Sequence, residues 1–267
     1  METENNCHNC DIPMTGNFCS NCGQKQYQRI DGQYIWTEIQ ETILHTNKGF
    51  LYSIFEIIKN PGKTAREFLD GKRVKHYKPL MLAFVLSGIN AFISLRILGL
   101  MDKLRVYYSA TPNMNSEFMN DYLSFFSSYN SLIMLLLLPI FAVFTKIAFK
   151  KWGQNYYEHI VMNSYILSYF TIFSIIVVFP IIFIYKIDPE NIVLVSSLQM
   201  LIMPFILIWF YKGFYPNRPF RNIIWKVCIS MILILLGYIA IIIVGIIIGF
   251  VIAYAQGPEA MEYFKPQ

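Results

Sequence analysis

Long apolar runs separated by short polar segments fill roughly the last two thirds of the chain. Five of these runs approach or exceed the ~20 residues that an α-helix needs to cross a bilayer, and they carry almost no charge. The fifth run has 29 residues, so its helix must tilt or project from a ~30 Å hydrocarbon core. We therefore predict an all-α integral membrane protein whose bundle, residues 80–255, has spans at about 80–100, 131–149, 160–185, 192–211 and 227–255.

Upstream of the first span, apolar positions recur at helical spacing in segments that are too short to cross a membrane. This pattern predicts amphipathic helices over residues 33–46, 49–59 and 64–69, with Pro61 and Gly62 ending the second. These helices could lie in the headgroup plane or pack on the bundle, and the sequence leaves both placements open. A periodic set of aromatic residues predicts one more amphipathic helix inside the loop 101–130.

The composition agrees with this fold class and excludes a soluble domain. The chain is 55% hydrophobic and 15% charged, with a mean hydropathy of +0.42. A net charge of +5 would suggest a nucleic-acid partner for a soluble protein, but here the basic residues lie beside the apolar runs. Lipid headgroups are the nearer anions, so we expect membrane lipids and no nucleic acid as partners of these residues.

The distribution of Lys and Arg predicts the orientation in the membrane. The first residues lack the basic and apolar regions of a signal peptide, so we expect a cytosolic N-terminus. Five spans then place 17 of the 22 Lys and Arg residues in the cytosol and the tail, residues 256–267, outside. The juxtamembrane region 27–79 ends in a basic segment that contacts anionic headgroups or acts only as a topology signal. Its four candidate residues are Lys72, Arg73, Lys75 and Lys78.

Four cysteines near the N-terminus carry the most specific chemistry in the sequence. They form two Cys-x2-Cys pairs separated by eight residues: Cys7, Cys10, Cys19 and Cys22. Two such pairs can offer four thiolates to one tetrahedral ion, which predicts a zinc ribbon over residues 1–26, with iron or a redox dithiol as alternatives. A reducing cytosol disfavours disulfides. Because four cysteines close the site to substrate, we expect the zinc to be structural.

Five short motifs follow one another in the first third of the chain. They are FCSNCGQ at 18–24, KGFLY at 48–52, NPG at 60–62, FLDGKR at 68–73 and YKP at 77–79. In this order and spacing they resemble a bacterial family, frequent in Bacteroidota, that is known as a domain of unknown function. Its members combine an N-terminal zinc ribbon with a multi-pass membrane region. The resemblance implies this fold and a location in the bacterial cytoplasmic membrane, and it implies no particular activity.

Candidate functional groups inside the spans are few. Ionisable residues lie near the span ends, and the polar residues of the third span are expected to form interhelical hydrogen bonds. Glu158 and His159 have no nucleophile or metal ligand at a recognisable spacing, so we expect no enzymatic activity. Gly245 and Gly249 form a Gly-x3-Gly face in the fifth span. This face predicts close packing of helices, within the chain or between two copies in a homo-oligomer.

Two functions fit these features. The first is an interaction or scaffolding protein of the membrane, in which the zinc ribbon is a cytosolic docking head for a protein partner. The alternative is a transporter of a small molecule or lipid, whose spans bend at Pro139, Pro180 and Pro204 and whose ribbon is regulatory. A closed metal site, a charged cytosolic head and spans without a central ionisable residue favour the first function.

Overall fold

The computed structural model describes residues 6–26, 29–35, 49–111, 114–256 and 265. In chain order, its helices are α2 (Phe50–Lys59), α3 (Pro61–Leu69), α4 (Pro79–Phe92), α5 (Leu100–Ala110), α6 (Glu117–Ser128), α7 (Asn130–Ala148), α8 (Tyr156–Phe173), α9 (Phe179–Ile184), α10 (Pro189–Phe214) and α11 (Phe220–Gln256). Two π-helical turns, η1 (Ile93–Ile97) and η3 (Ser174–Val178), continue α4 and α8, and a 3-10 turn, η2 (Lys150–Trp152), follows α7.

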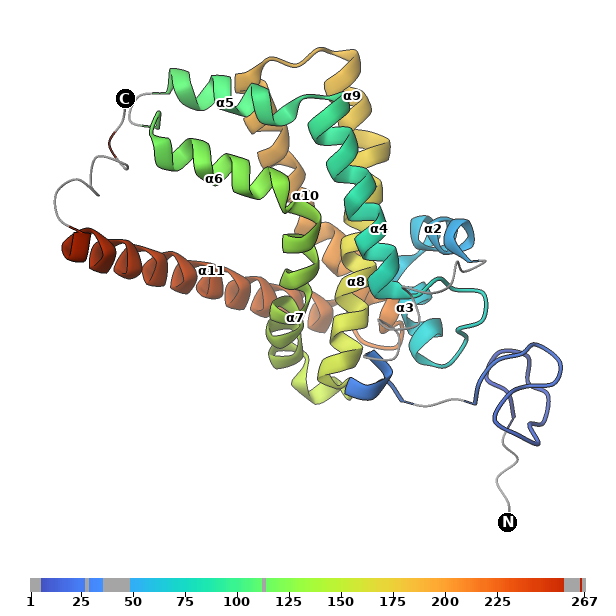
Figure 1. The fold of residues 1–267 in the computed structure, drawn as a ribbon. Coiled ribbons are helices and arrows are strands. Elements are labelled where there is room, and N and C mark those ends of the chain that lie inside the picture. The colour runs from blue at the N-terminus through green and yellow to red at the C-terminus, as the bar shows by residue number, and fades with distance from the viewer. Residues whose placement is uncertain (1–5, 27–28, 36–48, 112–113, 257–264, 266–267) are drawn as a thin grey trace.

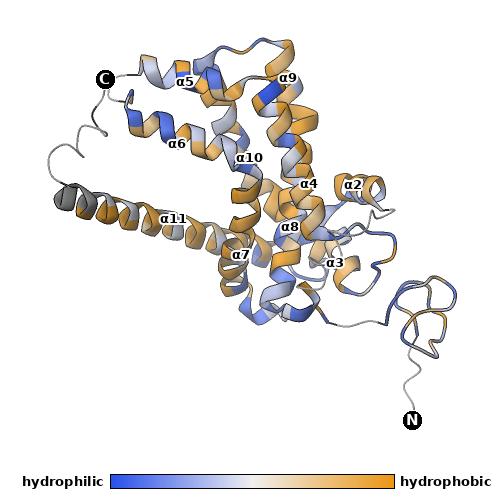
Figure 2. Cartoon of the chain, in the orientation of Figure 1, coloured by the Kyte–Doolittle hydropathy of each residue, from blue (hydrophilic) through white to orange (hydrophobic). Residues whose placement is uncertain are grey.

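Five helical stretches among the described residues are long and apolar enough to cross a membrane. They are Pro79–Ile97, Asn130–Ala148, Tyr156–Ile184, Pro189–Phe214 and Phe220–Gly249. This confirms the predicted fold class, an all-α membrane protein with about five spans and an N-terminal cysteine module. Figure 2 shows apolar residues along these helices, whereas polar residues gather in the cysteine module and in the α7–α8 connection.

Helix α8 lies at the centre of the helix bundle. It packs against α4 and α7, which also contact each other, while α10 packs against α3, α5 and α11 (Figure 1). In an apolar 18-residue segment of Tyr156–Ile184, 44% of the residues are buried inside the protein. The corresponding share is at most 22% in each of the other four stretches. The side chains of α8 therefore face protein on more sides than those of any other candidate span.

Asparagine and serine side chains of the third span form hydrogen bonds inside the bundle, whereas both ring nitrogens of the buried His159 have no hydrogen-bond partner among the described residues. Asn163 Nδ2 donates to Thr145 Oγ1 of α7 at 3.0 Å, and Gln199 of α10 donates to Ser174. The serines between them donate to carbonyl oxygens one turn earlier in α8. Interhelical hydrogen bonds, as expected from the sequence, thus account for the polar groups of Asn163 and Ser174.

Helix α11, as far as it is described, contacts the bundle along its first half only. It contacts α7 and α10, and Phe144 of α7 lies against Gly237. Farther along, α11 projects away from the other helices (Figure 1), and its most apolar window contains no buried residue. A β-carbon at Gly245 or Gly249 would have no atom within 4 Å. In the described part of the chain these two glycines make no helix contact, so their packing against a second copy stays a prediction.

The short helices before the first span pack on the bundle, and α2 keeps an apolar outer face. Ile57 of α2 and Phe68 of α3 are buried in the main core, where Phe68 contacts Tyr165 of α8. By contrast, Leu51 and Phe55 of α2 are 67% and 60% exposed. Packing is therefore observed for the inner face, and the outer face suits the headgroup region.

Two other segments differ in how well the sequence pattern anticipates them. The helix expected over residues 33–46 lies mostly outside the described residues. In this segment the structure describes a helix only at residues 32–35. In the loop 101–130, α6 forms where the aromatic residues recur, but α5 forms as well. Helix α5 was not predicted from the sequence, although Leu100, Leu104, Tyr107 and Tyr108 recur at helical spacing, and no residue of this helix is fully buried.

The NPG motif allows α3 to cross α10 at backbone distance. Asn60 Oδ1 accepts a hydrogen bond from the Lys63 N–H at 2.9 Å, and Pro61 occupies the first turn, where its missing N–H costs nothing. A β-carbon at Gly62 would lie 2.7 Å from the backbone nitrogen of Phe214. Glycine is therefore required at the position where α3 meets α10.

Candidate metal centre and its docking contacts

The two cysteine pairs lie in two similar tight turns. In each turn the N–H of the first cysteine donates to the carbonyl oxygen five residues later, at 2.9 Å in the first turn and 2.7 Å in the second. The residue directly after the second cysteine has a positive φ, 59° for Asp11 and 72° for Gly23. One isolated β-bridge closes each turn. The same local fold thus presents each pair of thiols.

These turns bring the four sulfur atoms into one group. Cys7 Sγ lies 3.6 Å from Cys22 Sγ, Cys10 Sγ lies 3.5 Å from Cys19 Sγ, and all four lie within 4.8 Å of one another. A tetrahedral ion with metal–sulfur bonds of ~2.3 Å would hold its sulfur ligands ~3.8 Å apart. None of the four cysteines forms a disulfide. The predicted cysteines therefore form a group that can hold a metal ion.

Hydrogen bonding and crowding shift the acidities of these thiols in opposite directions. The backbone N–H groups of Cys22 and Asn21 lower the pKa of Cys19 to about 6, and a backbone N–H also lowers the pKa of Cys22. The backbone N–H of Ile12 and the Asn21 side chain lower the pKa of Cys10, but desolvation and the neighbouring thiols of Cys19 and Cys22 together outweigh them, so this pKa rises to about 11. Four thiolates this close require a cation between them, which favours metal binding.

Gln24 holds the cysteine module against the loop that follows α3. Gln24 Nε2 donates to the Gly71 carbonyl oxygen, and Gln24 Oε1 accepts from the Arg73 N–H at 3.3 Å. His8 Nδ1 lies 3.0 Å from the Asp70 carbonyl oxygen. Gln24 is 5% exposed, and Gly71 has a φ of 107°, which favours glycine. The motifs FCSNCGQ and FLDGKR, far apart in the sequence, therefore meet in one contact.

The chain after the cysteine module is fastened to the start of α8. Arg29 Nε and Nη2 donate to the two carboxylate oxygens of Glu158 at 3.0 and 3.1 Å, and Nη2 also donates to the Gly153 carbonyl oxygen. Asn155 Nδ2 donates to the carbonyl oxygen of Ile30, which is buried. Glu158 and Asn155 also form the capping box of α8. Glu158 thus anchors the module to the bundle as well as starting the helix.

The four residues predicted to contact lipid lie in the loop between α3 and α4 and differ in their surroundings. Lys72 and Lys75 are exposed. Arg73 faces the protein, since its Nε donates to the Phe68 carbonyl oxygen and its guanidinium lies 4.6 Å from the ring centroid of Tyr34. Lys78 is half-buried directly before α4. Contact with anionic headgroups stays a prediction for these residues.

Comparison with known proteins supports the family resemblance over one segment. Residues 47–90 match the family described as "Protein of unknown function (DUF3667)". The matched segment contains α2, α3, the basic loop and most of α4, and it leaves out the four cysteines and the later apolar helices. Neither the curated proteins nor the solved structures include a match to the chain.

Proposed function

We propose that this chain is a multi-pass, non-enzymatic protein of the bacterial cytoplasmic membrane, with a structural zinc ribbon that acts as a docking head for a protein partner. Zinc is the proposed ion because it favours four thiolates in a tetrahedral arrangement. A cytosolic location would keep these thiols reduced. With four protein ligands, the ion has no open position at which a substrate could bind.

The observation that carries the docking role is an exposed aromatic side chain on a fixed head. Phe18, which directly precedes the ligand Cys19, is 63% exposed, and Ile12 on the other cysteine turn is exposed as well. The contacts of Gln24 and Arg29 hold the head to the membrane part of the chain. Exposed aromatic residues on a preorganised support are typical of positions that anchor a partner.

Photo-crosslinking from position 18 in native membranes tests this proposal. Phe18 is replaced by a photoreactive phenylalanine, and Ser20, exposed on the same turn, provides the control position. We expect one protein adduct from position 18, weak labelling from position 20, and loss of the adduct when Cys19→Ser removes the metal. The absence of an adduct, or equal adducts from both positions, would refute the docking role.

The metal content provides a second readout. The purified chain should contain about one zinc ion, and Cys19→Ser should abolish it. Gln24→Ala should retain the zinc and yet make the cysteine module more sensitive to protease, because it removes only the contact with the loop after α3. Full zinc occupancy in Cys19→Ser would contradict the assignment of the site.

A transporter with a regulatory ribbon is the alternative function, and it is supported by the irregular helices. Wide π-helical turns continue α4 and α8, and Pro139 and Pro204 lie inside α7 and α10. Such features can serve as hinges when spans move. A solute that co-purifies with the chain and is released when Pro204→Ala straightens α10 would favour this function.

A further inference from the structure

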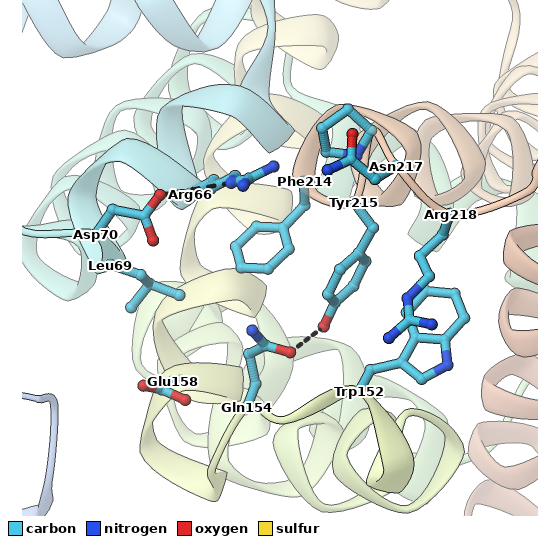
Figure 3. A pocket seen from close by; sticks show the side chains of 11 residues that line it. Arg66, Leu69, Asp70, Trp152, Gln154, Glu158, Phe214, Tyr215, Asn217 and Arg218 are labelled. Carbon is cyan, nitrogen blue, oxygen red and sulfur yellow. Dashed lines mark hydrogen bonds and ion pairs between the residues drawn. The ribbon is translucent and has the colours of Figure 1, made fainter.

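A cavity of about 480 Å³ lies where α3, the α7–α8 connection, the end of α10 and the α10–α11 loop meet (Figure 3). Its inner wall includes the buried side chains of Leu69, Phe214 and Tyr215, and its rim includes the exposed residues Asp70 and Arg218. A volume in this range accommodates a small ligand or a lipid headgroup. The proposed docking role makes no use of this cavity.

The cavity is located where two of the apolar stretches end. The third candidate span begins at Tyr156 and the fourth ends at Phe214, while the lining residues fall at 152–158 and 214–218. Lipid phosphates lie at the ends of membrane-spanning helices, outside the hydrocarbon core. The lining residues therefore flank the level at which lipid phosphates are found.

Among the described residues around the cavity, one cation has no carboxylate partner. Arg66 pairs with Asp70, with 3.4 Å between Nε and Oδ2. Glu158 accepts hydrogen bonds from Arg29 on both of its carboxylate oxygens. In the part of the chain that the structure describes, Arg218 has no carboxylate within ion-pair distance, and its guanidinium lies over an aromatic ring of the wall. The site as a whole therefore attracts an anion.

Hydrogen-bond donors on the same wall add to this preference. Burial raises the pKa of Tyr215 well above its usual value, so its hydroxyl keeps its proton and donates to Gln154 Oε1 at 2.6 Å. This bond leaves Gln154 Nε2 turned away from Tyr215 (Figure 3), without a hydrogen bond to any described residue. The side-chain amide of Asn217 at the rim offers a further N–H donor.

We propose that this cavity binds a phosphate group, held by Arg218 and Arg66 and by the side-chain amides of Gln154 and Asn217. The planar fork of a guanidinium matches two phosphate oxygens, and its stacking on Trp152 holds Arg218 in place while its edge remains available. The ligand is a molecule that carries an accessible phosphate group. The phosphate of an anionic lipid and a soluble phosphate share this chemistry, and the position at the span ends favours the lipid.

Binding is measured on the full chain with two probes. In nanodiscs of phosphatidylcholine containing phosphatidic acid, native mass spectrometry reports the phosphatidic acid that the protein retains. In an uncharged detergent, equilibrium dialysis with labelled inorganic phosphate reports binding of a soluble anion. Arg218→Gln should lower the affinity for the bound probe by about tenfold or more, because charged hydrogen bonds to the phosphate are lost.

The substitution is designed to leave the fold intact. Lys212 Nζ donates to the backbone carbonyl oxygen of Arg218 at 3.1 Å, so the loop keeps this hydrogen bond after the side chain is changed. Arg221→Gln is the matched control, because it removes the same charge from the start of α11, outside the cavity lining. It should leave the binding of both probes unchanged.

The results distinguish the two sources of phosphate. Phosphatidic acid that inorganic phosphate does not displace identifies a lipid ligand, whereas saturable binding of inorganic phosphate identifies a soluble one, and either supports the site. The proposal is wrong if neither probe binds, or if Arg218→Gln and Arg221→Gln weaken binding equally. Because these measurements do not involve the cysteines or Phe18, the phosphate site can fail while the docking role stands.

Discussion

Replacing Gly62 by Ala should force α3 away from α10. A β-carbon at this position would lie 2.7 Å from the backbone nitrogen of Phe214 and closer still to the carbonyl oxygen of Phe210. Both are backbone atoms of α10, so no side-chain rotation can relieve the contact. Gly62 has no positive φ, and alanine suits its helical conformation. A loss of stability in Gly62→Ala would therefore come from the steric contact with α10 and not from backbone strain.

The size of the effect follows from two opposing contributions. Extra volume in a close-packed contact costs ~1–3 kcal/mol. Alanine in place of glycine gains at most ~1 kcal/mol in a helix interior, and Gly62 is only the second residue of α3. We expect Gly62→Ala to lower the free energy of unfolding by about 1–2 kcal/mol. The damage should be greatest around α3, which carries the buried Phe68 and Leu69.

Thermal unfolding in detergent, combined with amide hydrogen exchange, measures this loss. Gly88→Ala is the matched control, since Gly88 is also a helical glycine but a β-carbon there would have no atom within 4 Å. Gly88→Ala should be neutral or stabilising, whereas Gly62→Ala should lower the Tm by several degrees and speed exchange in α3. A Gly62→Ala protein that equals Gly88→Ala in both measurements would refute the close crossing of α3 and α10.

Two further predictions concern the same region and its membrane side. Burial lowers the pKa of His76 below its ordinary 6.5, so the contribution of His76 to the free energy of unfolding is complete above about pH 6.5 and falls as the pH decreases. Protease sensitivity of the α3–α4 loop should therefore rise on acidification, and His76→Gln should remove this pH dependence. A membrane-impermeant amine reagent applied to intact cells should modify Lys186 and spare Lys72 and Lys75, and modification of Lys72 from outside would contradict the predicted orientation. In nanodiscs, anionic lipid should slow the modification of Lys72 and Lys75 more than that of Lys186.

The features that the sequence predicts are those determined by residues close together in the chain. A bilayer imposes its length and hydrophobicity on each span separately, so the all-α class and the five candidate spans follow from local runs. The cysteine group is local as well, because each Cys-x2-Cys turn forms its own hydrogen bonds and only one reversal brings the two turns together. Both predictions require no knowledge of how distant segments pack.

The contacts that position the cysteine module could not be predicted in this way. Gln24 and Gly71 are 47 residues apart, and Arg29 and Glu158 are 129 residues apart. Nothing in the local patterns around Gln24 or Arg29 separates them from solvent-exposed polar residues. The cavity in Figure 3 likewise combines four segments whose meeting depends on the packing of α3 against α8 and α10. For α11, hydropathy predicts a location in the membrane but does not predict which helix packs against it.

Glu158 connects the cysteine module with the cavity, and this connection has a testable consequence. Its carboxylate lines the cavity, yet its charge is balanced by Arg29, which lies three residues after the end of the cysteine module. Removing the metal should loosen that module and release Arg29, which would leave an unbalanced carboxylate facing a bound phosphate. Chelation should therefore weaken retention of phosphatidic acid several-fold, although no cysteine touches the cavity.

A double-mutant comparison separates this coupling from general unfolding. Arg29→Gln alone should weaken phosphate binding as chelation does, and chelation of the Arg29→Gln protein should have little further effect, because both changes act through the same carboxylate. If chelation weakens binding equally in both proteins, the metal acts on the cavity by another route. If chelation has no effect in either protein, the cysteine module and the cavity are energetically independent, and the Arg29–Glu158 ion pair serves only to anchor the module.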